Sequence, residues 1–183
     1  MRVTMARGES QTTEATAQPF TTGAVAAAQK RRRGFSLIEL LIVVAIILII
    51  SAISIPNLLR SRMAANEASA VGSLRTITAA CVTYSSIYGI GFPAALSNLG
   101  TSGGAGPASA DLLDNTLAAG VKSGYVFVYT SSAAVSNVVP AYAVQANPLT
   151  WSQTGTRYFF TDQSGVIRFN LSAAASANDS PIS

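Results

Sequence analysis

The sequence predicts an α+β fold in which one long N-terminal helix packs against a small antiparallel sheet. Three observations predict it. An almost uncharged apolar run covers residues 35–55, a helical apolar period continues from residue 57 to about residue 88, and four strand-like runs follow residue 120. The first half of the helix can span a membrane, because twenty-one helical residues cover about 30 Å.

The charges are divided unevenly between the N-terminal segment and the rest of the chain. Residues 1–34 hold six basic and two acidic residues, whereas residues 35–183 hold six of each. The net charge of +4 therefore belongs to the first segment, and nucleic-acid binding is not indicated. The chain has one cysteine, no histidine and no acids at catalytic or metal-binding spacing. We therefore expect no enzymatic activity, no metal and no cofactor.

Residues 1–29 have the composition of a disordered segment, rich in Thr, Ala, Gln and Gly without an apolar period. The basic block Lys30–Arg33 precedes the apolar run and predicts a cytoplasmic N-terminus. A secretory signal peptide is the ordinary alternative, but its apolar core is usually about 7–15 residues long. A plain signal anchor would not explain Glu39, because an acid at membrane depth marks a functional site.

After Pro56 the helical pattern predicts two different faces. One face is an apolar stripe expected to face a core, made of Leu59, Met63, Ala70, Leu74, Ile77, Cys81, Tyr84 and Tyr88. The opposite face consists of small uncharged residues, among them Ala65, Ala68, Gly72, Ala79 and Thr83. We expect this small face to pack against neighbouring helices, although alanines chosen for helix propensity are an alternative.

The remainder of the chain predicts a small sheet. Gly89 and Pro93 end the helix, residues 97–109 form a loop, and residues 111–119 form a short helix. Aromatic and β-branched runs predict strands at residues 124–130, 141–146, 157–161 and 165–170, with a hairpin turn before Gly165. Residues 172–183 are rich in Ser and Ala, which predicts a flexible tail.

The stretch Gly34-Phe35-Ser36-Leu37-Ile38-Glu39, with its basic block, apolar run and Pro56, resembles the type III signal of type IV pilins and type II secretion pseudopilins. The resemblance implies cleavage between Gly34 and Phe35 by prepilin peptidase, followed by N-methylation of Phe35. It also implies that Glu39 pairs with the Phe35 amine of a neighbouring subunit during assembly. Capping of its own helix is the alternative role of Glu39. Pro56 would bend the helix.

The implied protein is a prepilin that waits in the inner membrane with a cytoplasmic N-terminus and then polymerises into a surface filament. Its implied partners are copies of itself, prepilin peptidase and the membrane assembly platform with its ATPase. A pseudopilin of a type II secretion system, or a minor pilin, is the alternative. The expected segments are a removed leader at 1–34, a membrane and assembly half at 35–56, an amphipathic half at 57–92, a sheet-bearing head at 93–171 and the tail at 172–183.

Overall fold

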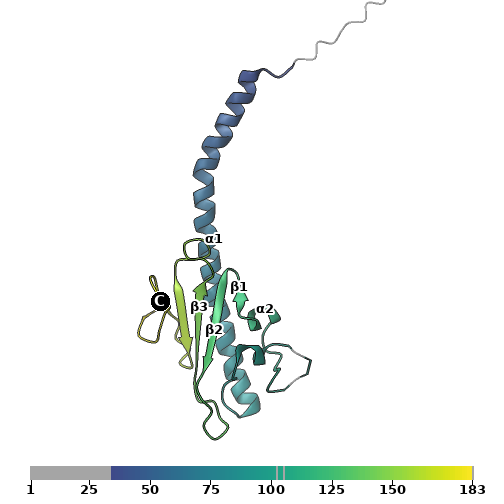
Figure 1. The fold of residues 1–183 in the computed structure, drawn as a ribbon, viewed down its shortest axis with the longest axis vertical. Helices are drawn as coiled ribbons and strands as arrows, with labels where there is room; N and C mark the ends of the chain where they lie inside the picture. The colour runs from purple at the N-terminus through teal and green to yellow at the C-terminus, as the bar shows by residue number, and fades with distance from the viewer. Residues whose placement is uncertain (1–33, 102, 105, 183) are drawn as a thin grey trace, which may run out of the picture.

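The computed structural model describes residues 34–182 apart from 102 and 105. The expected leader, except for Gly34, lies outside the described residues. The chain forms one long helix whose second half carries a head built on a six-stranded sheet (Figure 1). The α+β fold that the sequence predicts is confirmed.

Helix α1 extends without interruption from Leu37 to Tyr88. It ends where the sequence predicts, because Gly89 adopts the left-handed conformation (φ 66°) and its N–H donates to the Ser85 carbonyl at 3.0 Å. Pro56 lies inside α1 and removes one backbone donor, yet the helix continues through it. Figure 1 shows α1 as a curved rod rather than two helices joined at a break.

The head contains a sheet in which each strand is antiparallel to the next and the strands lie side by side in chain order. Its strands are β1 (Val121–Lys122), β2 (Tyr125–Ser131), β3 (Tyr142–Pro148), β4 (Tyr158–Asp162), β5 (Arg168–Asn170) and β6 (Ser180–Pro181). The four predicted strands correspond to β2, β3, β4 and β5. Gly165 (φ 74°) makes the predicted turn between β4 and β5.

Two short helical elements connect α1 with the sheet. The 3₁₀ helix η1 (Leu96–Leu99) buries both of its leucines at the start of the stretch that the sequence predicts as a loop. The predicted short helix is α2 (Asn115–Ala118), one turn long. It begins at Asp114, whose carboxylate accepts a hydrogen bond from the Leu117 N–H at 2.9 Å.

The core lies between the second half of α1 and one face of the sheet (Figure 1). From α1 it receives Ala70, Leu74, Ile77, Cys81 and Tyr84, and from the sheet Tyr125, Phe127, Val144, Ala146 and Phe159. The predicted stripe is therefore confirmed from Ala70 to Tyr84. Leu59 is 53% exposed, contrary to expectation, because it lines an open cavity between α1 and the β3–β4 loop instead of packing in the core.

The end of the chain differs from the predicted flexible tail. Strand β6 pairs with β5, Ala175 is fully buried, and the Gln145 side chain donates to the Ala175 carbonyl at 3.1 Å. The Asp179 carboxylate accepts from the Ser176 N–H at 2.7 Å. The prediction failed because the small residues of this segment show no apolar period. Their size lets the segment lie close to the outer face of the sheet, and the segment therefore belongs to the head.

Candidate assembly segment and helix faces

The residues predicted for processing and assembly lie at the open end of α1. The Phe35 side chain is 89% exposed, and a side chain at Gly34 would meet no atom of the described residues within 4 Å. Glu39 lies in the first turn, where its Oε2 accepts a hydrogen bond from the Ser36 N–H at 3.2 Å. Its Oε1 accepts none from the described residues. Glu39 therefore caps its own helix in the single chain and keeps one oxygen for a second donor.

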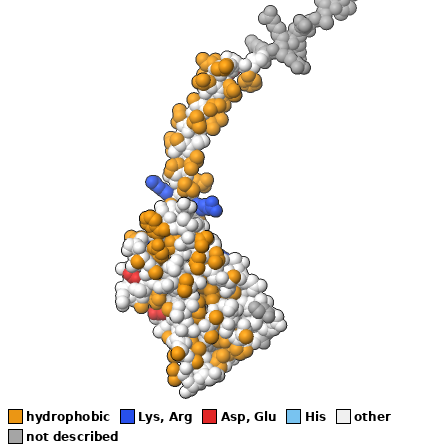
Figure 2. Space-filling view, viewed as in Figure 1, with side chains coloured by type: hydrophobic (Ala, Val, Ile, Leu, Met, Phe, Trp, Pro, Cys, Tyr) orange, Lys and Arg blue, Asp and Glu red, His pale blue; other side chains and the backbone are white. Residues whose placement is uncertain are grey.

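The first half of α1 is an apolar rod without contacts to the head. Between Leu37 and Ile55 the large apolar side chains are 47–80% exposed. The most apolar 18-residue window has a mean hydropathy of 3.0, and none of it is buried. Figure 2 shows this bare, largely hydrophobic stem projecting from the head. Its length and composition suit a membrane-spanning helix, and the apolar surface needs a lipid or protein neighbour.

The small face predicted on the second half of α1 points away from the head. Its members Ala65, Ala68, Gly72, Ala79 and Thr83 are all exposed. The Thr83 hydroxyl donates to the Ala79 carbonyl at 2.9 Å, and the Thr76 hydroxyl donates to the Gly72 carbonyl at 3.0 Å. These hydroxyls are satisfied inside the helix, so covering the face would leave no hydroxyl proton unpaired.

Known proteins share the N-terminal segment of this chain. Residues 29–55 match the family described as the prokaryotic N-terminal methylation motif. A stretch of 38 residues, 21% of this chain, is 58% identical to the type IV wide pilus major component PilA4 of Thermus thermophilus. Over a short part of its length, the chain is therefore similar to proteins that carry this methylation motif and to a type IV pilus component. The match covers 29% of the length of PilA4, and no solved structure matches the chain.

The matched methylation motif contains Gly34, Phe35 and Glu39, and Pro56 follows it directly. The structure does not gather these four residues into one site. They are spread along α1 and the residues just before it, and Gly34 and Pro56 are more than twenty positions apart. The small face lies further along α1, beyond the matched motif. The described residues hold no group of three metal-ligating side chains. The likeness to known proteins therefore rests on the segment that forms the start of α1.

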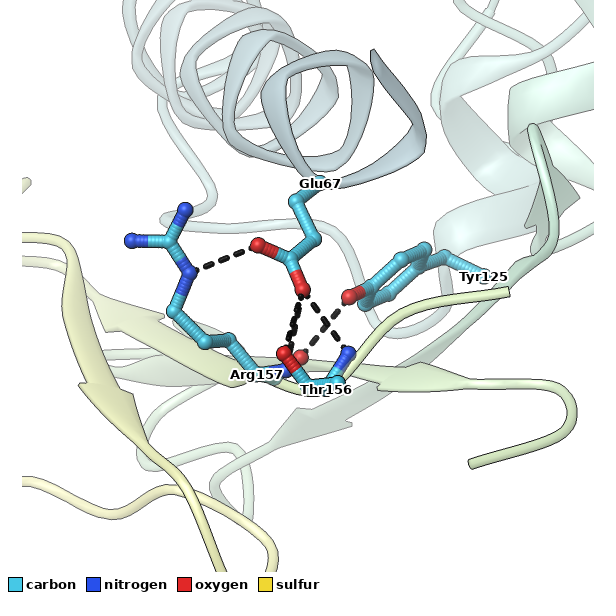
Figure 3. A network of polar contacts seen from close by, with 4 residues as sticks. All are labelled: Glu67, Tyr125, Thr156 and Arg157. Carbon is cyan, nitrogen blue, oxygen red and sulfur yellow. Dashed lines mark hydrogen bonds and ion pairs between the residues drawn. The ribbon is translucent and has the colours of Figure 1, made fainter. Parts of the chain in front are cut away.

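One polar site joins α1 to the head, and it was not identified from the sequence. Glu67, on α1, is 5% exposed (Figure 3). Its Oε1 accepts from the Thr156 N–H at 2.8 Å, the Thr156 hydroxyl at 3.0 Å and the Arg157 N–H at 3.2 Å. Its Oε2 accepts from Arg157 Nε at 2.7 Å. The adjacent Tyr125 hydroxyl donates to the Arg157 carbonyl at 2.8 Å, so the loop before β4 is held on both sides.

The surroundings of Glu67 favour its charged form. Burial alone would raise the pKa of Glu67. The net effect is a pKa below its ordinary value, because several hydrogen bonds and one charge together outweigh burial. The hydrogen bonds come from the Thr156 backbone, the Arg157 side chain and the Thr156 hydroxyl, and the charge is that of Arg157. The carboxylate therefore stays ionised at neutral pH and fixes the head against one turn of α1.

A signal for this site was present in the helical period. At 100° per residue, Glu67 lies about 60° from Ala70 and about 20° from Leu74, just beyond the edge of the core-facing stripe. An acid at such a position needs a partner, because a buried unpaired carboxylate is strongly unfavourable. The identity of that partner could not be read from the sequence, since Thr156 and Arg157 lie 89 and 90 positions away.

Proposed function

We propose that this chain is the precursor of a structural subunit of a type IV pilus. It would wait as a single-pass inner-membrane protein, with its N-terminus in the cytoplasm and its head on the other side. After cleavage it would polymerise with copies of itself into a filament through α1, without catalysing a reaction. The observation that carries the proposal is the methylation motif at residues 29–55 joined to a bare apolar helix. The pilus component PilA4, which is 58% identical over a stretch of 38 residues, favours a pilus over a secretion pseudopilus.

Cleavage between Gly34 and Phe35 creates the amine on which assembly depends. Prepilin peptidase would cut this bond and methylate Phe35, and the described residues leave room for an enzyme around Gly34. A carboxylate inside the hydrocarbon costs at least about 2 kcal/mol, and a free amine is similarly unfavourable there. Glu39 and the new Phe35 amine of a neighbour would relieve each other's poor solvation when subunits meet. The free Oε1 of Glu39 can accept that amine while Oε2 still caps the helix.

The small face would be the second contact between subunits. Helices approach closely where their contacting residues are small, and the gain then comes from packing. Ala65, Ala68, Gly72, Ala79 and Thr83 are uncovered by the chain's own head, which supports this role. The other partners would be the inner-membrane assembly platform and its ATPase, which extract the subunit from the membrane. Pro56 would let α1 bend between the two packing regions.

The start of the mature chain and the role of Glu39 test the proposal together. Mass spectrometry of filaments sheared from cells should find an N-methylated Phe35 as first residue. Glu39→Ala and Glu39→Gln should both be inserted and cleaved, and both should yield little filament, because neither carries a charge for the Phe35 amine.

Glu39→Gln is the matched control for the capping role, because its amide oxygen can still accept from the Ser36 N–H. Normal filament from Glu39→Gln, together with loss in Glu39→Ala, would assign the residue to helix capping alone. A mature chain that starts at Met1 or beyond Ile55 would overturn the proposed processing.

A further inference from the structure

We propose that the head carries a surface that docks on anionic phospholipid headgroups while the precursor is in the membrane. This juxtamembrane surface consists of Arg60 and Arg62 on α1 and of Leu149 and Trp151 on the loop between β3 and β4. The inference rests on the proposed function, because it requires that the first half of α1 spans the bilayer. It adds a contact that places the head against the membrane before assembly.

The two arginines lie where α1 leaves the hydrocarbon. From Leu37 to Leu59 the helix carries one charged residue, Glu39, and Arg60 is the next charge. That stretch is about 35 Å long, slightly more than the hydrocarbon core of a bilayer. Arg60 and Arg62 therefore fall at the depth of the headgroups. Figure 2 shows basic side chains projecting where the bare stem meets the head.

The loop that carries Trp151 stands beside the same turns of α1. Asn66 Nδ2 donates to the Thr154 carbonyl of this loop at 2.9 Å. A cavity of about 650 Å³ is lined by Leu59 and Arg62 from the helix and by residues 152–154 from the loop. The loop is thus held at the end of the apolar segment, and β3 leads to this upper end of the head in Figure 1.

The apolar side chains on the loop are held outward by an ordered backbone. Trp151 is 58% exposed and Leu149 is 61% exposed. The Thr154 N–H donates to the Thr150 carbonyl and the Ser152 N–H to the Gly155 carbonyl, both at 2.9 Å. Tryptophan is favoured at the level of lipid headgroups, where its ring meets apolar surroundings and its N–H meets water. An exposed tryptophan on a fixed loop at this depth matches that environment.

The charges complement the same surface. Arg60 and Arg62 are exposed, and neither forms an ion pair with a carboxylate among the described residues. The next acid along α1, Glu67, is already paired with Arg157. Free guanidinium groups bind phosphate oxygens well. A neighbouring subunit is the other conceivable occupant, but continuity with the apolar segment and the unpaired arginines favour the bilayer.

Trp151 is the single tryptophan of the chain, so its fluorescence reports on this surface alone. The full-length precursor is reconstituted into vesicles of phosphatidylethanolamine and phosphatidylglycerol, with phosphatidylcholine vesicles for comparison. In the anionic vesicles we expect blue-shifted emission, protection from acrylamide and quenching by brominated lipids. Arg60→Gln and Arg62→Gln should each lower the ratio of docked to free heads about fivefold.

Two matched controls separate docking from general effects. Arg75→Gln removes one exposed charge from the same helix, about 20 Å beyond Arg62, and should leave the emission of Trp151 unchanged. Val135→Trp combined with Trp151→Phe moves the probe to the β2–β3 connection at the opposite end of the head, where Val135 is 66% exposed. That probe should stay accessible to acrylamide and should not be quenched by brominated lipids.

The outcomes distinguish this proposal from the function on which it rests. If the chain does not float with the vesicles, the membrane-spanning role of α1 fails, and the docking surface fails with it. If the chain inserts but Trp151 remains fully accessible to acrylamide, only the docking surface is wrong. Protection of Trp151 in assembled filaments but not in vesicles would assign the surface to contacts between subunits and would also overturn the proposal.

Discussion

Glu67 fixes α1 to the head, and its removal should destabilise the head without touching the apolar core. In Glu67→Ala, the N–H groups of Thr156 and Arg157 lose their acceptor at the boundary between helix and sheet. Each orphaned donor costs about 1 kcal/mol here, at the low end for buried groups because both residues are only partly buried. The lost charge-assisted bond to Arg157 adds about 1 kcal/mol, limited because the Arg157 side chain is 42% exposed and becomes hydrated.

The expected loss is therefore about 3 kcal/mol, which lowers the Tm of a head of this size by roughly 10 °C. The assay is thermal unfolding of the detergent-solubilised full chain, followed by near-ultraviolet circular dichroism of the buried tyrosines. Arg75→Gln is the matched control, because it removes one exposed charge from the same helix. A Tm for Glu67→Ala within about 2 °C of the wild-type Tm would refute the role assigned to the carboxylate.

The pH dependence provides a second check on the same residue. The pKa of Glu67 in the folded chain lies below the ordinary 4.5 expected in the unfolded chain. Between those values the unfolded chain binds more protons, so the contribution of Glu67 is present above pH 4.5 and is lost as the pH falls through the folded pKa. The Tm difference between wild type and Glu67→Gln should therefore shrink on acidification. A difference that stays constant from neutral to strongly acid pH would contradict a stabilising charge.

Two further predictions concern Cys81 and the small face. Burial raises the pKa of the Cys81 thiol to about 12, because the charged thiolate would lose its contact with water. N-ethylmaleimide should therefore label Cys81 only after unfolding, and rapid labelling of the folded chain would contradict its burial. Gly72→Arg should leave the head as stable as wild type to within about 0.5 kcal/mol and should abolish filaments, whereas Gln163→Arg on the β4–β5 hairpin should permit them. Normal filaments from Gly72→Arg would show that the small face is not a contact, and an unfolded head would place it in the core.

The predictable parts of the fold follow from patterns that act over a few residues. The helical period alone was enough to predict the apolar stripe from Ala70 to Tyr84. The conformational freedom of Gly89 alone was enough to predict the end of α1. A run of aromatic and β-branched residues was enough to predict strand β2. The same local reasoning mistook the chain end for a flexible tail, because a segment of small residues gains its order from the surface that covers it.

The sequence by itself determined the apolar segment, the long helix with its end at Tyr88, and the four main strands. Only the tertiary structure decided that Glu67 is buried against the β3–β4 loop, that the chain end adds β6, and that the loop carrying Trp151 lies beside the end of the apolar segment. Each of these depends on residues far apart in the chain, as in the 89 positions between Glu67 and Thr156. Such contacts form only once the register of the sheet is set against α1, and no local period or turn residue encodes that alignment.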